Sequence, residues 1–324
     1  MHPNKSLIFK KYTAYKPVPG EHLIVESRPF DPDADPPPGG FTVKNTYLSF
    51  DPYQRGQIRL PTDKGTYSPR WVEDKPIVPG DLVSGFADAG EYAAVLAELA
   101  ATSQVLPALP QGLNITPSAL INALGITGFT AYVSFFDFIT EPRAGKTMFI
   151  SAASGGVGQI VGQLAKMHGM RVIGSTGSLE KVDFVTKELG FDAAWNYKTE
   201  KTANALSRLA PDGLDVYYDN VGGEQLETAL SHMKDFGIID KDKYGVKTLM
   251  NVFLKRLTIH GFICSDPQHV TKHMPSFATD MITWIAEGKI KTREEVVVGM
   301  DNAAAAWSKN VDHIEGAMLS RLEL

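Results

Sequence analysis

A glycine-rich run, Ala152-Ala153-Ser154-Gly155-Gly156-Val157-Gly158, holds the residue types best suited to chemistry in this chain. Glycine lets the backbone turn tightly and approach a pyrophosphate without a Cβ in the way, and the amides that open the following helix attract the anion. The run lacks the full GxGxxG pattern, and glycines between a strand and a helix can also serve packing alone. Its place in a series of strand–helix units favours a dinucleotide site, with Gly155 to Gly158 at the phosphates.

The stretch that follows the next predicted strand indicates which dinucleotide binds. A site that prefers NAD usually carries an acidic residue here, bonded to the ribose hydroxyls. This chain is neutral from Gly174 to Leu179, and the hydroxyls of Thr176 and Ser178 with the ammonium group of Lys181 suit a 2′-phosphate. The sequence therefore predicts NADPH rather than NADH. The alternative for Lys181 is an ordinary solvated lysine, which is the commoner fate of lysines.

The remaining reactive residue types predict no metal site. Cys264 is the single cysteine, so it forms neither an internal disulfide nor a thiolate zinc cage, and its apolar surroundings favour an inert core residue. His269 and His273 have the i, i+4 spacing of a helical metal pair. Pro267 and Pro275 bracket them and no HExxH glutamate is present, so we expect a polar surface turn and no metal.

Alternating strands and helices surround the glycine-rich run from about Ser118 on. We expect strands over 147–152, 171–175, 193–197 and 214–219, and helices over 157–165, 178–189 and 224–233. Such repeated units favour an α/β fold with a doubly wound parallel sheet. In the tail we expect a helix from Pro275, a strand at 296–298 and a helix over 302–308. The first 118 or so residues, rich in proline and glycine between short strands, indicate a β-rich module.

Length and composition agree with an ordinary globular protein of two domains. The 324 residues are 43% hydrophobic, which provides a full core and excludes wholesale disorder. The 32 basic against 37 acidic side chains give a net charge of −5, so nucleic acid and acidic membranes have no electrostatic basis as partners. No apolar stretch approaches the ~18 residues of a membrane span, and no secretory signal is visible. We expect a soluble, cytoplasmic protein.

Several segments, in order from residue 48 to about 290, together resemble one protein family. The run 48–56 (LSFDPYQRG) is similar to the DPYMRG signature of the zinc-independent medium-chain dehydrogenase/reductases, in the branch of leukotriene B4 12-hydroxydehydrogenase/prostaglandin reductase and the alkenal double-bond reductases. Other matching segments are 65–67 with 75–77, 125–132, 152–158, 177–181, 196–198, 219–223 and 255–257 with 261–263.

The resemblance implies two domains and an NADPH cofactor. A GroES-like β-barrel domain, residues 1–118 with 290–324, carries the substrate cleft, and a Rossmann domain spans 119–289. Homodimers are usual in the family. The residues expected to bind NADPH or NADP are Thr127, Gly155, Gly156, Val157, Gly158, Thr176, Ser178, Lys181, Tyr197, Asn220, Phe262, Ile263 and Cys264.

The reaction implied by the resemblance is NADPH-dependent reduction of a C=C bond conjugated to a carbonyl, in an α,β-unsaturated aldehyde or ketone. Hydride adds to the β-carbon, and charge builds on the carbonyl oxygen as an enolate, so a hydrogen-bond donor is needed there. We expect Tyr53 to be this donor, and Tyr67 and Tyr244 to line the substrate pocket. The alternatives are a quinone or secondary-alcohol oxidoreductase, or a non-catalytic NADPH-binding protein.

The chain departs from the family at three places. About two barrel strands are missing between Ile77 and Gly80, and the C-terminal asparagine ahead of a Gly-Lys pair has no clean counterpart. After Gly237 only a remnant of a sheet strand remains. A missing central strand would leave backbone donors unpaired, so either a neighbouring segment fills the sheet or the site is compromised.

Overall fold

The computed structural model describes residues 1–45, 47–51, 54–58, 89–100, 115, 117–139, 142–240, 248–312 and 320–323. Contacts within the chain divide it into two units. Unit 1 comprises Met1–Ile121, Glu294–Ile314 and Met318–Leu324, and unit 2 comprises Asn122–Arg293 and Glu315–Ala317. The chain thus passes between units after residues 121 and 293, beside the domain boundaries at 118 and 289 that the resemblance implies.

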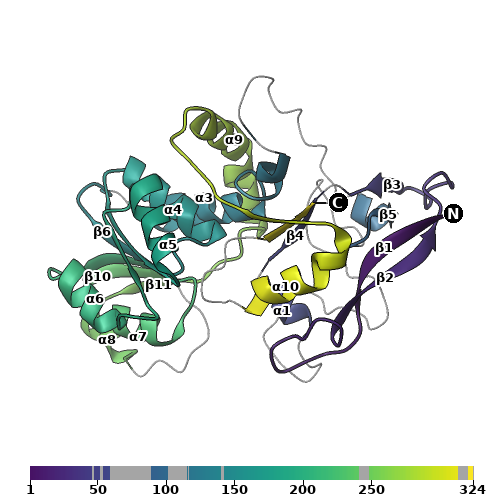
Figure 1. The fold of residues 1–324 in the computed structure, drawn as a ribbon. Coiled ribbons are helices and arrows are strands. Elements are labelled where there is room, and N and C mark those ends of the chain that lie inside the picture. Colours follow the sequence, from purple (N-terminus) through teal and green to yellow (C-terminus); the bar gives the residue numbers. More distant parts are fainter. Residues whose placement is uncertain are drawn as a thin grey trace. The chain divides into compact units, whose positions relative to one another are not determined.

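A six-stranded parallel sheet forms the centre of unit 2 (Figure 1). Numbered along the chain and starting from β8, the strand order is 3-2-1-4-5-6, the doubly wound arrangement of dinucleotide-binding folds. The predicted α/β class is therefore confirmed. The strands, from one edge to the other, are β11 (Thr258–His260), β10 (Met233–Asp240), β9 (Leu214–Tyr218), β6 (Thr147–Ile150), β7 (Arg171–Thr176) and β8 (Ala193–Asn196).

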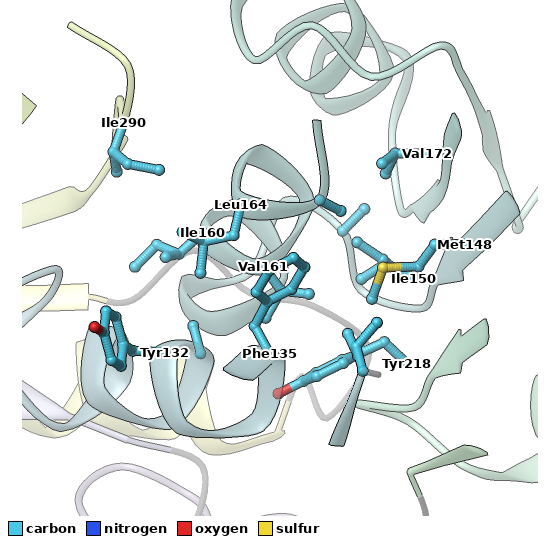
Figure 2. Close-up of a cluster of buried hydrophobic side chains, with 14 of the residues drawn as sticks. Tyr132, Phe135, Met148, Ile150, Ile160, Val161, Leu164, Val172, Tyr218 and Ile290 are labelled. Atoms are coloured by element: carbon cyan, nitrogen blue, oxygen red, sulfur yellow. The ribbon is translucent and has the colours of Figure 1, made fainter. Parts of the chain in front are cut away.

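Helices cover both faces of this sheet. Met148 and Ile150 of β6 point into one core, drawn in Figure 2, whereas Phe149 between them points into a second core on the opposite face. Because both faces are buried, β6 is apolar at three successive residues rather than alternating between apolar and polar ones. The first core lies beneath α3 (Ile126–Phe138), α4 (Gly156–Met167) and α9 (Pro267–Ala286), and the second beneath α6 (Thr202–Leu209), α7 (Gly223–His232) and α8 (Met250–Leu254).

Strand β10 fills the sheet where the sequence departs from the family. Ile238, Ile239 and Asp240 pair with β11 on one side and β9 on the other. The register shifts between Met233 and Ile238, and Phe236 in that interval has a left-handed φ of 64°. The sheet is therefore complete at this place, because an irregular strand pairs with both neighbours. Residues 241–247 lie outside the described part.

Two buried glutamines of α4 bind the chain where it leaves unit 2. Gln163 donates from Nε2 to the carbonyl of Lys291 (2.7 Å) and accepts from its amide (2.8 Å). Gln159, one turn earlier, makes the same pair of bonds with Arg293, at 3.3 and 2.9 Å. The two carboxamides therefore hold the backbone of the last residues before Glu294, where unit 1 resumes.

Helix α9 replaces the surface turn that the sequence predicted around His269 and His273. Pro267 lies in its first turn, where a missing amide hydrogen costs nothing. Pro275 lies on the exposed face, so water can bond to the carbonyl of Thr271 that loses its helical donor. The prediction of a polar surface turn was wrong, because the two imidazoles are only 8% and 6% exposed.

Both imidazoles contact Asp137 of α3. Nδ1 of His269 lies 2.8 Å from Oδ2, and Nε2 of His273 lies 2.9 Å from Oδ1. Lys272 completes the cluster with an ion pair to the same carboxylate. Burial raises the pKa of Asp137, but the bonds from these three side chains outweigh it and bring the pKa to about 2. Within the described ranges, no group of three or more His, Cys, Asp or Glu side chains is arranged to hold a metal ion.

The described part of unit 1 contains three small sheets and short helices. Its core includes Phe9, Phe50 and Trp307. The Trp307 indole donates to Oε1 of Gln54 (2.9 Å), and Gln54 donates to the carbonyl of Ser49 (3.2 Å), which anchors the described part of the LSFDPYQRG run. The elements are β1 (His2–Phe9) with β2 (Leu23–Phe30); β3 (Phe41–Lys44) with β5 (Tyr92–Val95); β12 (Glu295–Val298), β13 (Ser320–Glu323) and β4 (Tyr47–Phe50); and the helices α1 (Gln54–Gln57), α2 (Ala97–Ala100) and α10 (Ala303–Asp312).

The predicted strand at 296–298 is confirmed as part of β12. The predicted helix over 302–308 is confirmed from Ala303 on, as part of α10, and Asn302 belongs to the 3-10 turn before it. None of the helices in the described ranges is long and apolar enough to cross a bilayer.

Candidate cofactor site

The glycine-rich run forms the turn between β6 and α4. Ala152 has a left-handed φ of 51°, and its carbonyl accepts from the amide of Gly155, the N-cap of α4, at 2.8 Å. Gly158 packs onto this turn so closely that a Cβ would lie 2.6 Å from the Ala152 oxygen. The amides of Gly156, Val157 and Gly158 open the helix without intrahelical acceptors, so they are available to an anion.

Ser154 places a hydroxyl without a partner in the same turn. Its side chain is fully buried, and its Oγ has no hydrogen-bond partner among the described residues. A buried hydroxyl left unpaired costs about 1–3 kcal/mol, so such groups are expected where a ligand or water completes them. The Ser154 hydroxyl and the first amides of α4 are hydrogen-bond donors in the same turn, and such a set of donors suits a phosphate group.

The carboxyl ends of β6 and β9 are tied together beside this turn. Asn220 donates from its backbone amide to Oγ of Ser151 and from Nδ2 to the Ser151 carbonyl, both at 2.8 Å. β6 and β9 are neighbours, and the helices that follow them cover opposite faces of the sheet. Ligands of doubly wound sheets bind at such a switch point. The structure therefore places Asn220 next to the glycine-rich turn.

Asp219 shapes the turn after β9 with one of its two oxygens. Oδ1 accepts from the Tyr217 hydroxyl (2.7 Å) and from the amides of Val221 (3.1 Å) and Gly222 (2.8 Å). Oδ2 is buried without a partner among the described residues. Burial raises the pKa of Asp219 despite these bonds. Burial likewise raises the pKa of Tyr217 well above its usual value, and the negative charge of Asp219 adds to the effect.

We expect Asp219→Asn to keep or raise the melting temperature at pH 7, because the amide oxygen can accept the same bonds without a buried charge. Asp219→Ala removes the acceptor and is expected to lower the free energy of unfolding by about 1–3 kcal/mol. Thermal and urea unfolding of both variants test this. Equal losses in the two variants would show that the negative charge itself stabilises the turn.

The turn between β7 and α5 (Leu179–Asp183) presents small hydroxyls and no free acid. Ser178 accepts from the amide of Lys181 (3.3 Å), which confirms it as the predicted N-cap. Thr176 donates to the carbonyl of Ser178 (3.2 Å). Glu180, the first acidic side chain after β7, lies 3.2 Å from Nη1 of Arg293. The predicted helix over 178–189 is α5 followed by a π-helical turn, Phe184–Glu188.

The other predicted cofactor residues follow the remaining strands. Tyr197 comes directly after β8, and Phe262, Ile263 and Cys264 come after β11. Cys264 is buried, as predicted, and its Sγ lies 3.2 Å from Oγ1 of Thr130 on α3, the helix that also carries Thr127. Because all six strands are parallel, their carboxyl ends share one edge of the sheet. The predicted residues that follow these strands therefore lie along that edge, and the role of all the predicted residues in binding stays a prediction.

The predicted substrate-side residues Tyr53, Tyr67 and Tyr244 lie outside the described residues. The sequence reasoning missed Ser154 as a buried donor and Ser151 as the partner of Asn220. A serine inside a glycine-rich turn was visible in the sequence. The bond across two strands was not, because it depends on β6 and β9 being neighbours.

A doubly wound sheet of order 3-2-1-4-5-6, with a glycine-rich turn at its switch point, defines a dinucleotide-binding α/β protein. The donors of this turn and the neutral end of β7 fit a phosphorylated dinucleotide.

Comparisons with known proteins identify the family. The family described as zinc-binding dehydrogenase matches residues 156–280. The NADP-dependent oxidoreductase RED1 of Cochliobolus heterostrophus is 41% identical over 95% of this chain and 94% of its own length. The 2-alkenal reductase (NADP(+)-dependent) of Nicotiana tabacum is 34% identical over 94% of this chain and 92% of its own. The structure of CurA in complex with NADPH from Vibrio vulnificus has a TM-score of 0.79 and 26% identity, over 99% of both chains.

The chain therefore belongs to the medium-chain dehydrogenase/reductases, in the zinc-independent branch that contains the alkenal reductases, as its motifs predicted. The predicted combination of a Rossmann domain and a GroES-like domain is also confirmed.

Proposed function

We propose that this protein is an NADPH-dependent oxidoreductase that reduces the C=C bond of α,β-unsaturated aldehydes and ketones. The observation that carries the proposal is the phosphate-binding turn at the switch point together with the β7 end, where the first carboxylate, Glu180, is paired with Arg293. The names of two relatives, an NADP-dependent oxidoreductase and a 2-alkenal reductase, support the cofactor and the substrate class.

NADPH, when bound, supplies the hydride that adds to the β-carbon of the substrate. We assign the amides of Gly156 to Gly158 and the Ser154 hydroxyl to its pyrophosphate, and Lys181 to its 2′-phosphate. The electron pair of the C=C bond moves toward the carbonyl oxygen, where we assign Tyr53 as hydrogen-bond donor to the enolate. A proton from water or a tyrosine then reaches the α-carbon and completes the reduction. The homodimer expected from the resemblance stays a prediction.

The enzyme is expected to oxidise NADPH when a simple enone is present, with a saturated ketone as the product. Tyr53→Phe is expected to lower kcat by about 10²-fold, because an enolate donor acts mainly on the transition state. The loss of absorbance at the NADPH band measures kcat, and mass spectrometry identifies the product.

The control for this experiment is a parallel assay with a quinone and with a secondary alcohol plus NADP. Reduction of the quinone alone would replace the proposal by the quinone reductase alternative. Tight NADPH binding with no turnover of any substrate would identify a non-catalytic binder. Unchanged turnover in Tyr53→Phe would remove Tyr53 from its assigned role.

A further inference from the structure

The loops after β7 and β8 are bonded to each other at the site assigned to the 2′-phosphate. The backbone amide of Tyr197 donates to the carbonyl of Thr176 at 3.1 Å. A Cβ on Gly177 would lie 3.3 Å from the Tyr197 hydroxyl and 3.5 Å from Cε of Lys198. The side chain of Lys198 therefore reaches across from the β8 loop to the turn between β7 and α5.

The loop that carries Lys198 is held by its own hydrogen bonds. Oδ1 of Asn196 accepts from the amide of Lys198, and the Asn196 carbonyl accepts from the amides of Thr199 and Glu200, all at 3.0 Å. The ammonium nitrogen of Lys198 lies 5.9 Å from the centre of the Tyr197 ring. The backbone hydrogen bonds therefore fix the position of Cα of Lys198, and the Tyr197 ring lies beside its side chain.

Lys198 has no acidic partner within the described ranges, whereas several other cations of unit 2 have one. Lys166 pairs with Asp192, Lys187 with Asp183 and Arg208 with Glu200, each at 2.8 Å. Arg293 likewise pairs with Glu180, so the first carboxylate after β7 is already paired. The positive charge of Lys198 is therefore free at the place where the ribose of a dinucleotide lies in this fold.

We propose that Lys198 is a second charged group that recognises the 2′-phosphate of NADPH, and that it sets the preference for NADPH over NADH jointly with Lys181. This inference rests on the proposed cofactor. Cation–phosphate bonds are among the stronger hydrogen bonds, and NADH offers only neutral hydroxyls at the same position.

The test compares dissociation constants of the full-length wild type and Lys198→Ala for NADPH and NADH. We expect Lys198→Ala to weaken NADPH binding about five- to tenfold and to leave NADH within about twofold. Lys198→Arg is expected to retain most of the preference. Lys187→Ala is the matched control, because Lys187 is an exposed lysine of the helical segment that follows the turn, and its charge is already paired with Asp183. Adenosine 2′,5′-bisphosphate against AMP gives a second readout that needs no nicotinamide and no turnover.

Unchanged NADPH affinity in Lys198→Ala, or an equal loss for NADPH and NADH, overturns the inference. Circular dichroism shows whether Lys198→Ala has lost affinity because it is unfolded. If it has, the ratio of NADPH to NADH affinity in Lys198→Met is measured instead, and an unchanged ratio overturns the inference. These results leave the reductase proposal standing. A folded wild type that binds neither dinucleotide contradicts the proposed function itself, and the inference about Lys198 with it.

Discussion

Replacing Gly158 by alanine is expected to lower the affinity for NADPH by at least about tenfold, which corresponds to ~1.4 kcal/mol. The new Cβ would lie 2.6 Å from the Ala152 oxygen and 3.0 Å from Cα of Ala153. Both are backbone atoms of the glycine-rich turn, so the turn must move away from the N-terminus of α4 and its free amides. Fluorescence titration with NADPH measures the effect.

Gly162→Ala is the control for damage by packing alone. It is the same substitution one turn further along α4, but its Cβ would meet the ring of Phe191 rather than the turn. We expect this variant to lose stability while its folded fraction binds NADPH with nearly wild-type affinity. If Gly158→Ala binds NADPH as tightly as the wild type, the turn does not contact the cofactor's phosphates.

Asp137→Ala is expected to lower the free energy of unfolding by about 3 kcal/mol at pH 7. The substitution removes the acceptor of the His269 imidazole and the carboxylate that lies 2.9 Å from the buried His273 imidazole. Removing one partner of a buried polar cluster costs far more than removing an exposed ion pair. Urea unfolding measures the difference. Asp183→Ala, which breaks the exposed pair with Lys187, is the control and is expected to cost less than ~1 kcal/mol.

Acid should remove the contribution of Asp137 in a defined range. Its pKa of about 2 in the folded protein lies below the ordinary value of 3.8. A carboxyl with a lowered pKa stabilises the fold above its unfolded pKa, and this stabilisation disappears as the pH falls through the folded value. The difference in stability between the wild type and Asp137→Asn should therefore shrink from about pH 4 to about pH 2. A difference that stays constant over this range would assign the effect to packing.

Local signals in the sequence were sufficient for most of the nucleotide-binding unit. The spacing of apolar residues predicted β6, α4 and β7, and Ser178 was predicted as a cap because an N-cap acts on the amides directly after it. The glycine-rich turn was predicted for the same reason, since glycine is required by contacts within a few residues.

Features that depend on contacts between distant residues were not predictable. The proline residues around His269 indicated a turn, but the imidazole contacts a carboxylate 132 residues earlier in the chain. It lies on a buried face of α9 that also carries Phe277 and Met281. The approach of Lys198 to Gly177 likewise depends on β7 and β8 being neighbours. A single sequence contains no direct signal for either contact.

The two buried glutamines of α4 bind backbone peptide groups rather than side chains. The carboxamides of Gln159 and Gln163 bond to the main chain of Arg293 and Lys291 and to neither side chain, so these bonds do not select the residue types at positions 291 and 293. An insertion or deletion of one residue at Thr292 would instead bring the wrong peptide group to one of the carboxamides. We therefore expect the length of this stretch to be more tightly constrained than its residue types, apart from Arg293, whose side chain pairs with Glu180.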